Sequence, residues 1–275
     1  MTLQILISTM FRENLDFLKP IFSKNSIEDY DIIIVNQTTE DKMLSSQFSN
    51  IKVINSLERG SPTSRNLAIK NATADVCLMA DDDIVYEPNL KQTIINAYQE
   101  CPNADMISFE AINEDGNLYT NYFPEGTHNK KSLKKIFTWV ITFKRKVFKE
   151  HKVLFNHHFG VGSTFKGETE YVFLRNAFDK GLQMQHIAVT IVMHPNISSG
   201  VLMGSDNAFA AKTALRQRYL GNLSYLWLVK YTLYMWKDNY IRFSEIPRKF
   251  KLGLQAISNY KKLKATGEID KIYDI

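Results

Sequence analysis

The segment 76–83, VCLMADDD, places three consecutive aspartates directly after a run of apolar residues. The run Val76–Met79 predicts a buried strand, because a short apolar stretch bounded by polar residues suits a strand covered on both faces. A helix cap needs only one carboxylate, and three adjacent carboxylates repel one another, so the cluster calls for a cation or for raised pKa values. Hard oxygen ligands suit Mg²⁺ or Mn²⁺. We therefore expect Asp81, Asp82 and Asp83 to take part in a divalent-metal site.

Strands and helices are predicted to alternate on both sides of this segment. Apolar or β-branched runs predict the strands, and amphipathic or proline-led segments predict the helices. Up to residue 110 the predicted strands are Leu3–Ser8, Asp31–Val35, Ile51–Ile54, Val76–Met79 and Asp105–Glu110, and the predicted helices are Asn14–Lys24, Pro62–Asn71 and Asn89–Glu100. This order implies βαβ units and an α/β fold with a mostly parallel, Rossmann-like sheet.

In a sheet of this kind, ligands bind beyond the carboxyl ends of the strands. Polar residues follow three of the predicted strands, and they are Ser8 and Thr9, Asn36 and Gln37, and the three aspartates. These side chains are expected to share one edge of the sheet. The glycine-rich patterns of dinucleotide-binding and P-loop proteins do not occur, which argues against nicotinamide, flavin or ATP-phosphate sites of those types.

The pattern changes after Ala111. The elements predicted beyond it are a loop or hairpin at 113–132, a basic helix at Phe143–Lys152, a helix at Glu168–Lys180 and a strand at His186–Met193. Gly181 suits the left-handed position that commonly ends a helix. From about Lys212 onward the chain is expected to be entirely helical.

The composition is that of an ordinary soluble globular protein, with 44% apolar and 23% charged residues in a chain of 275. Cys77 and Cys101 provide neither a disulfide framework nor a zinc-ligand spacing, so a reducing, cytoplasmic compartment is the simplest expectation. The first ten residues lack a charged leader, and no run of about 18 apolar residues occurs. Neither a signal peptide nor a membrane-spanning helix is expected.

Two segments at a fixed spacing resemble a known family. Residues 59–66, RGSPTSRN, and 72–88, ATADVCLMADDDIVYEP, resemble the R-G-x-x-x-x-R-N segment and the D-x-D strand of family 2 glycosyltransferases with the GT-A fold. The pair is far more specific than a D-x-D motif alone, and the resemblance covers roughly residues 1–200. It implies an inverting transferase of bacterial polysaccharide-biosynthesis type. Such an enzyme moves a sugar from a nucleotide diphosphate donor, here expected to be UDP-linked, to a glycan or lipid-linked saccharide.

The resemblance also suggests a domain organisation. Residues 1–211 are expected to form the GT-A catalytic domain, with a nucleotide-sugar-binding half at 1–110 and an acceptor-side half at 111–211. Residues 212–275 are then a basic, aromatic helical tail outside the family pattern.

The donor side of the site follows from the same resemblance. Asp83 corresponds to the metal-coordinating aspartate, and Asp81 to the aspartate that contacts the ribose or the metal shell. His194 begins a loop near the metal or diphosphate, in which residues 196–200 would form a flexible cover. The other positions expected to bind the nucleotide sugar are Ser8, Thr9, Glu13, Asn36, Gln37, Arg65 and Asp82. Asn36 and Gln37 replace the acidic V-D-D-x-S run of the family, which leaves the nucleobase open.

An inverting transfer needs a carboxylate that takes the proton of the acceptor hydroxyl. The family supplies this base from an E-D pair at a helix start, and residues 167–170, GETE, resemble that position. Thr169 stands where the aspartate is expected, and a threonine cannot act as a base near neutral pH. Glu168 and Glu170 are therefore the candidates, and they point in different directions if the segment is helical. Glu168 is slightly favoured.

Residues 212–275 hold 13 Lys and Arg against 5 Asp and Glu, a net charge of +8, whereas residues 1–211 sum to −3. The apolar, aromatic stretch Leu223–Trp236 precedes a basic one at Arg242–Lys251. Trp and Tyr beside Lys and Arg suit a helix on the inner membrane face, and burial against the catalytic domain or in a homodimer fits equally well. Nucleic acid is disfavoured, because the aromatic and basic residues do not alternate.

Two alternative functions share parts of this pattern. A sugar nucleotidyltransferase also combines a Rossmann-like sheet with paired aspartates and Mg²⁺, but it would carry a glycine-rich basic loop after the first strand. Residues 8–12, STMFR, hold no glycine. A catalytically inactive sugar- or nucleotide-binding homologue would account for Asn36 and Thr169. Binding and turnover of a nucleotide sugar distinguish these functions.

Overall fold

The computed structural model describes residues 1–196 and 203–272. These residues form two compact units. Unit 1 consists of Met1–Phe155 and Phe173–Asn196, and unit 2 of Asn156–Val172 and the described part of Ile197–Asp274. The division expected at residue 211 does not follow these units, because Ala211 lies within the continuous helix α6 (Asp206–Leu220). The division expected at residue 110 falls inside a strand, β6 (Met106–Ile112).

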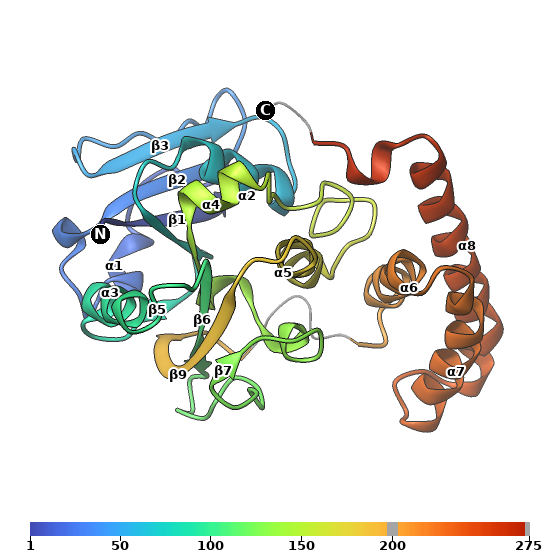
Figure 1. Ribbon diagram of the computed structural model, residues 1–275. Coiled ribbons are helices and arrows are strands. Elements are labelled where there is room, and N and C mark those ends of the chain that lie inside the picture. Colours follow the sequence, from blue (N-terminus) through green and yellow to red (C-terminus); the bar gives the residue numbers. More distant parts are fainter. Residues whose placement is uncertain (197–202, 273–275) are drawn as a thin grey trace. The chain divides into compact units, whose positions relative to one another are not determined.

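Unit 1 is built on one sheet with helices on both faces (Figure 1). Its strand order is β3-β2-β1-β4-β8-β6-β9-β5, and β7 pairs with β9. The strands are β1 (Leu3–Met10), β2 (Asp31–Gln37), β3 (Ile51–Ser56), β4 (Val76–Ala80), β5 (Val85–Tyr86), β6, β7 (Gly126–Thr127), β8 (Ile141–Lys144) and β9 (Met184–Met193). β5, β7 and β8 run against the direction of the others. The expected α/β class with a mostly parallel sheet is confirmed.

The parallel strands are apolar because helices cover them on both faces. The run Ile32–Val35 is at most 1% exposed, and every residue of β4 is buried. α2 packs on β1 and β2, and in Figure 1 it lies on the opposite side of these strands from α1 and α3. The helices of this part of the chain are α1 (Leu18–Ile21), α2 (Ser61–Asn71), α3 (Leu90–Glu100), α4 (Arg145–Glu150) and α5 (Thr169–Asp179).

Two predicted helices are wrong in extent. The helix expected at Asn14–Lys24 is reduced to α1, because Pro20 lacks the amide hydrogen that an α-helical ladder needs. The helix expected at Phe143–Lys152 begins only at Arg145. Phe143 is instead fully buried in β8, where it pairs with β4 on one side and β6 on the other. Such distant pairing overrides the local helical preference.

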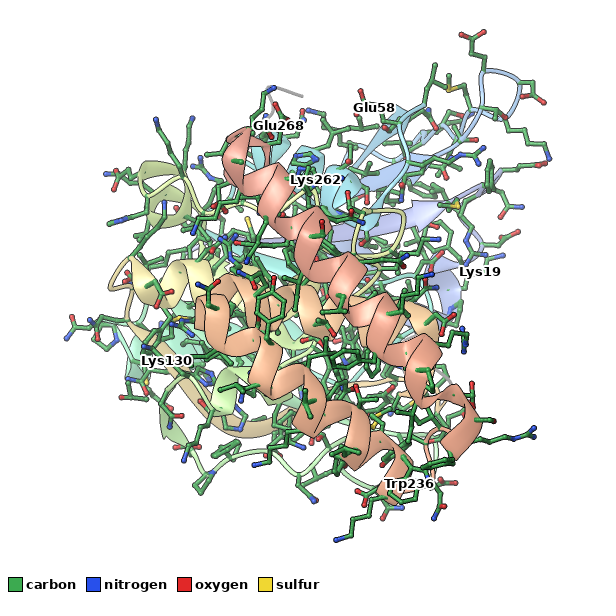
Figure 2. The ribbon with its side chains drawn as sticks, turned by 90° about the vertical axis from the view of Figure 1, so that its right-hand side faces the viewer. Lys19, Glu58, Lys130, Trp236, Lys262 and Glu268 are labelled. Atoms are coloured by element: carbon green, nitrogen blue, oxygen red, sulfur yellow. The ribbon has the colours of Figure 1, made fainter. Side chains whose placement is uncertain are left out.

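Unit 2 is mainly helical, as expected for the tail. Its long helices are α6, α7 (Ser224–Lys237) and α8 (Ile246–Ala265). Figure 2 shows α7 and α8 side by side, and Gly253 permits their close approach, because a Cβ there would lie 2.3 Å from a side-chain carbon of Leu228. Phe209, Met235 and Ile257 pack with Leu228 in the core of this unit. Within residues 1–196 and 203–272, no helix is both long and apolar enough to cross a membrane.

Candidate active site

The carboxyl ends of β1, β2 and β4 form one edge of the sheet in unit 1. β1 stays in register with β2 as far as the pair Met10 and Gln37, and with β4 as far as Ile7 and Ala80. The polar residues that follow these strands therefore emerge together, as expected. Each of the three aspartates beyond β4 meets a different nitrogen-bearing side chain there, and the three contacts are distinct in character.

Asp81 forms an ion pair with Arg65 of α2. Its Oδ1 lies 2.9 Å from Nη2 of Arg65, whose side chain is only 7% exposed and whose guanidinium lies 5.4 Å from the ring centre of Phe155. The start of α2 is held by Gln37, which accepts a 2.6 Å hydrogen bond from the backbone N–H of Gly60 and donates one of 3.3 Å to Ser64. Gln37 thus fixes the helix that carries Arg65.

Asp82 is held by Arg12 and Thr9. One carboxylate oxygen, Oδ2, accepts hydrogen bonds from Nη2 (2.7 Å) and Nε (2.9 Å) of Arg12 and from the Thr9 hydroxyl. Asn36 holds the backbone of Arg12, accepting from its N–H at 3.1 Å and donating to its carbonyl at 3.0 Å. Asn36 is fully buried and also donates to Asn55. The amide of Asn36 therefore positions Arg12, which the sequence interpretation did not assign.

Asp83 meets an imidazole. Its Oδ1 lies 3.5 Å from Nε2 of His194, and its side chain is 53% exposed. Partial burial raises the pKa of Asp83, the carboxylates of Asp81 and Asp82 raise it further, and His194 opposes them. The negative charge of Asp83 is therefore costly in this structure.

His194 is buried and its orientation is fixed. Its ring stacks on Trp139 at 3.9 Å between ring centres, and the edge of Tyr119 approaches at 5.3 Å. Nδ1 lies 2.7 Å from the carbonyl oxygen of Pro195. A carbonyl only accepts hydrogen bonds, so Nδ1 carries the proton, and in the neutral ring Nε2 presents its lone pair toward Asp83. This is the arrangement in which a histidine binds a metal.

The donor atoms of Asp83 and His194 fit a divalent cation. Neighbouring ligands of an octahedral ion at about 2.1 Å lie about 3 Å apart, close to the 3.5 Å between Oδ1 and Nε2. No group of three or more acidic, His or Cys side chains among residues 1–196 and 203–272 is arranged to hold a metal. An ion here would therefore complete its shell with oxygens from a ligand or from water, as Mg²⁺ commonly does.

The remaining donor-side positions differ in accessibility. The Ser8 hydroxyl is buried and has no hydrogen-bond partner in the described part of the chain, so it can still accept or donate toward a ligand. Glu13 lies at the surface, where its Oε1 pairs with Nζ of Lys42 at 2.8 Å. Residues 197–200 of the expected cover lie outside the described residues.

The two base candidates lie at the start of α5, in unit 2. Glu168 immediately precedes the helix with a φ of +62°, and its carbonyl accepts a hydrogen bond from the backbone of Val172 at 3.1 Å. This left-handed conformation is uncommon for glutamate and is typical of residues held under strain at functional sites. Burial and the charge of Glu168 raise the pKa of Tyr231 to about 12. Glu170 lies in the first turn, and Thr169 is buried.

Phe11 is a further residue that the sequence interpretation missed. It follows β1 with a φ of +55°, its ring is 41% exposed, and the guanidinium of Arg59 lies 5.0 Å from the ring centre. Nothing in the sequence indicates Phe11 or Trp139. Arg12 could have been found, because three adjacent acids require basic partners and Arg12 follows the end of a neighbouring strand.

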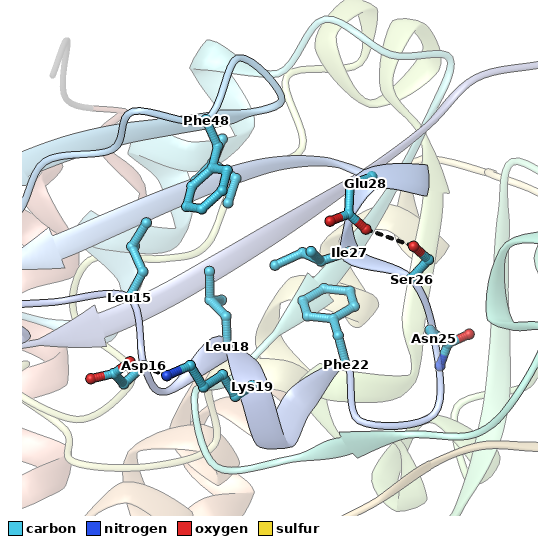
Figure 3. Close-up of a pocket in the computed structure, with 11 residues that line it drawn as sticks. Leu15, Asp16, Leu18, Lys19, Phe22, Asn25, Ser26, Ile27, Glu28 and Phe48 are labelled. Atoms are coloured by element: carbon cyan, nitrogen blue, oxygen red, sulfur yellow. Dashed lines mark hydrogen bonds and ion pairs between the residues drawn. The ribbon is translucent and has the colours of Figure 1, made fainter.

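A separate pocket of about 470 Å³ lies beside α1 and contains none of the predicted site residues (Figure 3). Its wall includes Leu15, Leu18 and Phe22, with Phe48 across the opening. Two short polar contacts, Asp16 with Lys19 and Ser26 with Glu28, lie at its rim. The pocket brings together no catalytic groups, so the strand edge remains the candidate site.

The model of the family described as glycosyl transferase family 2 matches residues 9–166, more than half of the chain. The chain belongs to glycosyl transferase family 2. The matched region includes the three aspartates, Arg12 and Arg65, and it ends just before Glu168. The resemblance inferred from RGSPTSRN and VCLMADDD is therefore confirmed.

Solved structures of TarS from S. aureus share the fold of this family 2 chain. TarS 1–349 superposes with a TM-score of 0.55 at 11% identity, covering 100% of this chain and 93% of TarS 1–349. The complex of TarS 1–349 with UDP-GlcNAc superposes with a TM-score of 0.57 at 10% identity, covering 100% of this chain and 95% of TarS 1–349. A longer TarS structure superposes with a TM-score of 0.63 at 12% identity, covering 98% of this chain and 50% of the TarS chain. No curated protein sequence matches significantly. The GT-A fold is confirmed.

Proposed function

We propose that the chain is a metal-assisted, inverting glycosyltransferase that uses a UDP-linked sugar and a glycan or lipid-linked saccharide acceptor. The Asp83–His194 pair supports the proposal, because a carboxylate oxygen and an imidazole nitrogen, both of types that bind divalent metals, lie 3.5 Å apart at the carboxyl edge of a parallel sheet. The UDP and UDP-GlcNAc complexes of S. aureus TarS support the choice of donor. Family membership favours sugar transfer over nucleotidyl transfer.

Asp83 and His194 would hold Mn²⁺ or Mg²⁺. When bound, the cation would neutralise the charge that develops on the departing diphosphate. Asp81 and Asp82 act differently in this proposal. Their pairing with Arg65 and Arg12 offsets the negative charge that would otherwise repel an incoming diphosphate.

The nucleoside would bind along the ends of β1 and β2. The unpartnered Ser8 hydroxyl and the exposed Phe11 ring supply a hydrogen bond and a stacking surface. Glu13 and Thr9 border the same edge. The resemblance places Asn36 and Gln37 at the nucleobase. In the proposal, Asn36 instead positions Arg12, and Gln37 positions the start of α2.

Glu168 is the proposed base. Its carboxylate would take the proton of the acceptor hydroxyl as that oxygen forms a bond to the anomeric carbon. The bond to the diphosphate oxygen breaks at the same time on the opposite face, and the nucleoside diphosphate leaves. The left-handed backbone of Glu168 supports its choice over Glu170, because strain of this kind is retained where function requires a fixed direction.

Release of free nucleoside diphosphate tests the function. The full chain with Mn²⁺ and saccharide acceptors should release UDP from a UDP-sugar, and removal of the cation with EDTA should stop it. Calorimetric binding of a UDP-sugar without turnover would indicate an inactive homologue. Pyrophosphate release from a nucleoside triphosphate and a sugar phosphate would indicate a nucleotidyltransferase. Either result overturns the proposal.

A side-by-side comparison of Glu168→Gln and Glu170→Gln tests the base. Each change keeps the size of the side chain and removes one carboxylate. Glu168→Gln should lower kcat by about 1000-fold with the donor dissociation constant unchanged, and Glu170→Gln should stay within about threefold of wild type. The opposite result would move the base to Glu170, and two active variants would exclude this helix start.

A further inference from the structure

The outer face of α7 in unit 2 carries apolar side chains that are exposed to solvent. The inner face, with Leu228, Tyr231 and Met235, is buried in the core of the unit. Exposed apolar residues recur at helical spacing on the other side, and they are Leu223, Leu226, Val229, Leu233 and Trp236. We call these five residues the α7 stripe. An apolar face exposed to solvent on a helix whose other face is already buried is typical of an interaction surface.

The charged side chains within α7 are all positive, and the exposed Asp238 follows at the end of the helix. Lys230 and Lys237 are exposed on the same helix, and α7 contains no Asp or Glu. Lys261 of α8 donates a hydrogen bond of 3.1 Å to the hydroxyl of Tyr225, at the edge of the stripe. Long lysine side chains can extend past an apolar surface and place their ammonium groups at a polar boundary.

Interfacial side chains gather at the carboxyl end of the stripe. Trp236 meets Phe243 edge to face at 5.4 Å between ring centres, and Tyr240 is exposed beside them. These three rings line a pocket of about 350 Å³ together with Asn239, Ile241, Arg242 and Glu245. Aromatic rings beside an arginine suit the headgroup layer, where one end of a side chain is apolar and the other hydrated.

We propose that the α7 stripe docks on an anionic lipid surface, with Lys230 and Lys237 at the phosphate level. A second copy of the chain suits the stripe less well. In a two-fold dimer the same face meets itself, so lysines on a helix without acids would meet lysines. Acidic lipid headgroups instead complement these charges. The proposal is independent of sugar transfer, since the stripe contains no residue of the candidate active site.

Co-sedimentation with vesicles tests the proposal. The full chain should bind vesicles of phosphatidylglycerol and phosphatidylcholine at least tenfold more tightly than vesicles of phosphatidylcholine alone. The double variant Leu226→Glu/Leu233→Glu should lose binding by at least tenfold, because two charges would have to enter the apolar layer. Lys230→Gln/Lys237→Gln should weaken binding mainly at low salt.

Leu57→Glu is the matched control, since Leu57 is an exposed leucine outside α7. It should bind like wild type, and circular dichroism should show all variants folded. The proposal is wrong if wild type does not bind anionic vesicles, or if Leu57→Glu weakens binding as much as the stripe variant. It is also wrong if wild type is a dimer that Leu226→Glu/Leu233→Glu makes monomeric without any vesicle binding. UDP release is measured separately, so loss of one property does not imply loss of the other.

Discussion

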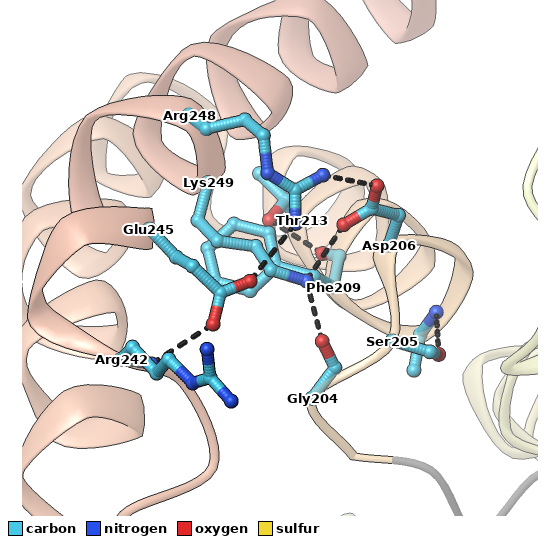
Figure 4. Close-up of polar contacts among 10 residues, drawn as sticks. Gly204, Ser205, Asp206, Phe209, Thr213, Arg242, Glu245, Arg248 and Lys249 are labelled. Carbon is cyan, nitrogen blue, oxygen red and sulfur yellow. Dashed lines mark hydrogen bonds and ion pairs between the residues drawn. The ribbon is translucent and has the colours of Figure 1, made fainter.

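Both units contain a cluster of carboxylates and basic side chains, and the two clusters are built differently. In unit 2, Asp206 receives Arg248 at 2.5 Å and Lys249 at 2.7 Å (Figure 4). Lys249 is 1% exposed, and its ammonium also donates to the carbonyl of Gly204. Hydrogen bonds from these two bases lower the pKa of Asp206. Every charge in this cluster has a partner of opposite sign.

In unit 1, two of three aspartates are paired with arginines, and the third is not. Asp83 faces Nε2 of His194, and burial raises the pKa of Asp83, whereas the pKa of Asp206 is lowered. Identical side chains thus acquire opposite properties from their neighbours. A cluster in which each charge is paired holds helices together, whereas a carboxylate that faces an imidazole nitrogen has the donor atoms that a divalent cation would need.

Among the changes that test the difference between the two clusters, the largest expected effect is the loss of sugar transfer in Asp83→Asn. The amide keeps the shape of the side chain and removes a charged ligand of the cation, so kcat should fall by at least about 100-fold. The melting temperature should change by no more than about 2 °C, because the change removes like-charge repulsion. Initial rates of UDP release and thermal unfolding measure the two properties. Transfer at the wild-type rate would refute the metal assignment.

Asp206→Asn is expected to lower stability and to leave the rate of sugar transfer unchanged. The substitution replaces the carboxylate that pairs with the buried Lys249 ammonium by a neutral amide. Because the Asp206 side chain is half exposed, the free energy of unfolding should fall by only about 2 kcal/mol. The rate of transfer per folded molecule should remain within about twofold of wild type. Urea unfolding and initial rates test this. The double variant Asp206→Asn/Lys249→Met should recover part of the lost stability. If it is no more stable than Asp206→Asn alone, the unpaired Lys249 charge is not the cause of the loss.

Arg12→Ala tests whether the paired aspartates serve the donor. Without Arg12, the charge of Asp82 would repel the diphosphate, so KM for the donor should rise about tenfold, or 1.4 kcal/mol. Lys24→Ala is a matched control, because the Lys24–Glu87 pair has the same 2.7 Å separation and similar exposure. Both variants should lose less than about 1 kcal/mol of stability. Equal KM values in the two variants would make Arg12 a structural residue.

The smallest expected effect concerns a third polar cluster, which lies in unit 1 and contains two buried histidines. Ser108 hydrogen bonds to Nε2 of His128 at 2.8 Å and to Nδ1 of His186 at 3.0 Å, and Ser132 contacts the other nitrogen of His128 at 2.9 Å. Burial lowers the pKa of His128 to about 4, and it also lowers that of His186.

Below an unfolded-state pKa of about 6.5, the unfolded chain binds protons that the folded chain excludes, so stability falls as the pH drops toward 4. For His128 alone, the loss between pH 7 and pH 5.5 is about 1 kcal/mol. The urea unfolding midpoint should fall less steeply with decreasing pH in His128→Gln than in wild type, measured between pH 7 and pH 5.5. An unchanged slope would mean that His128 is not the responsible group.

The sequence predicts secondary structure well where local signals agree with the fold. The runs DIIIV and VCLMA form β2 and β4, because an apolar stretch of this length suits a strand covered on both faces. The prediction fails at Phe143 because its partners, Cys77 and Met106, are far away in the chain. It also fails before Leu18, where the apolar spacing favours a helix that Pro20 interrupts.

Residue order alone predicts that polar residues follow the strands and that three aspartates lie at one edge of a parallel sheet. Because parallel strands end at the same edge of a sheet, residues that follow different strands in the sequence become neighbours in the fold. The ion-pair partner of each aspartate, in contrast, follows from the tertiary structure. Asp81, Asp82 and Asp83 are alike in residue type, and only the family resemblance assigned them different roles. Their electrostatic energies depend on the distances to Arg65, Arg12 and His194, which only the folded chain brings within 4 Å.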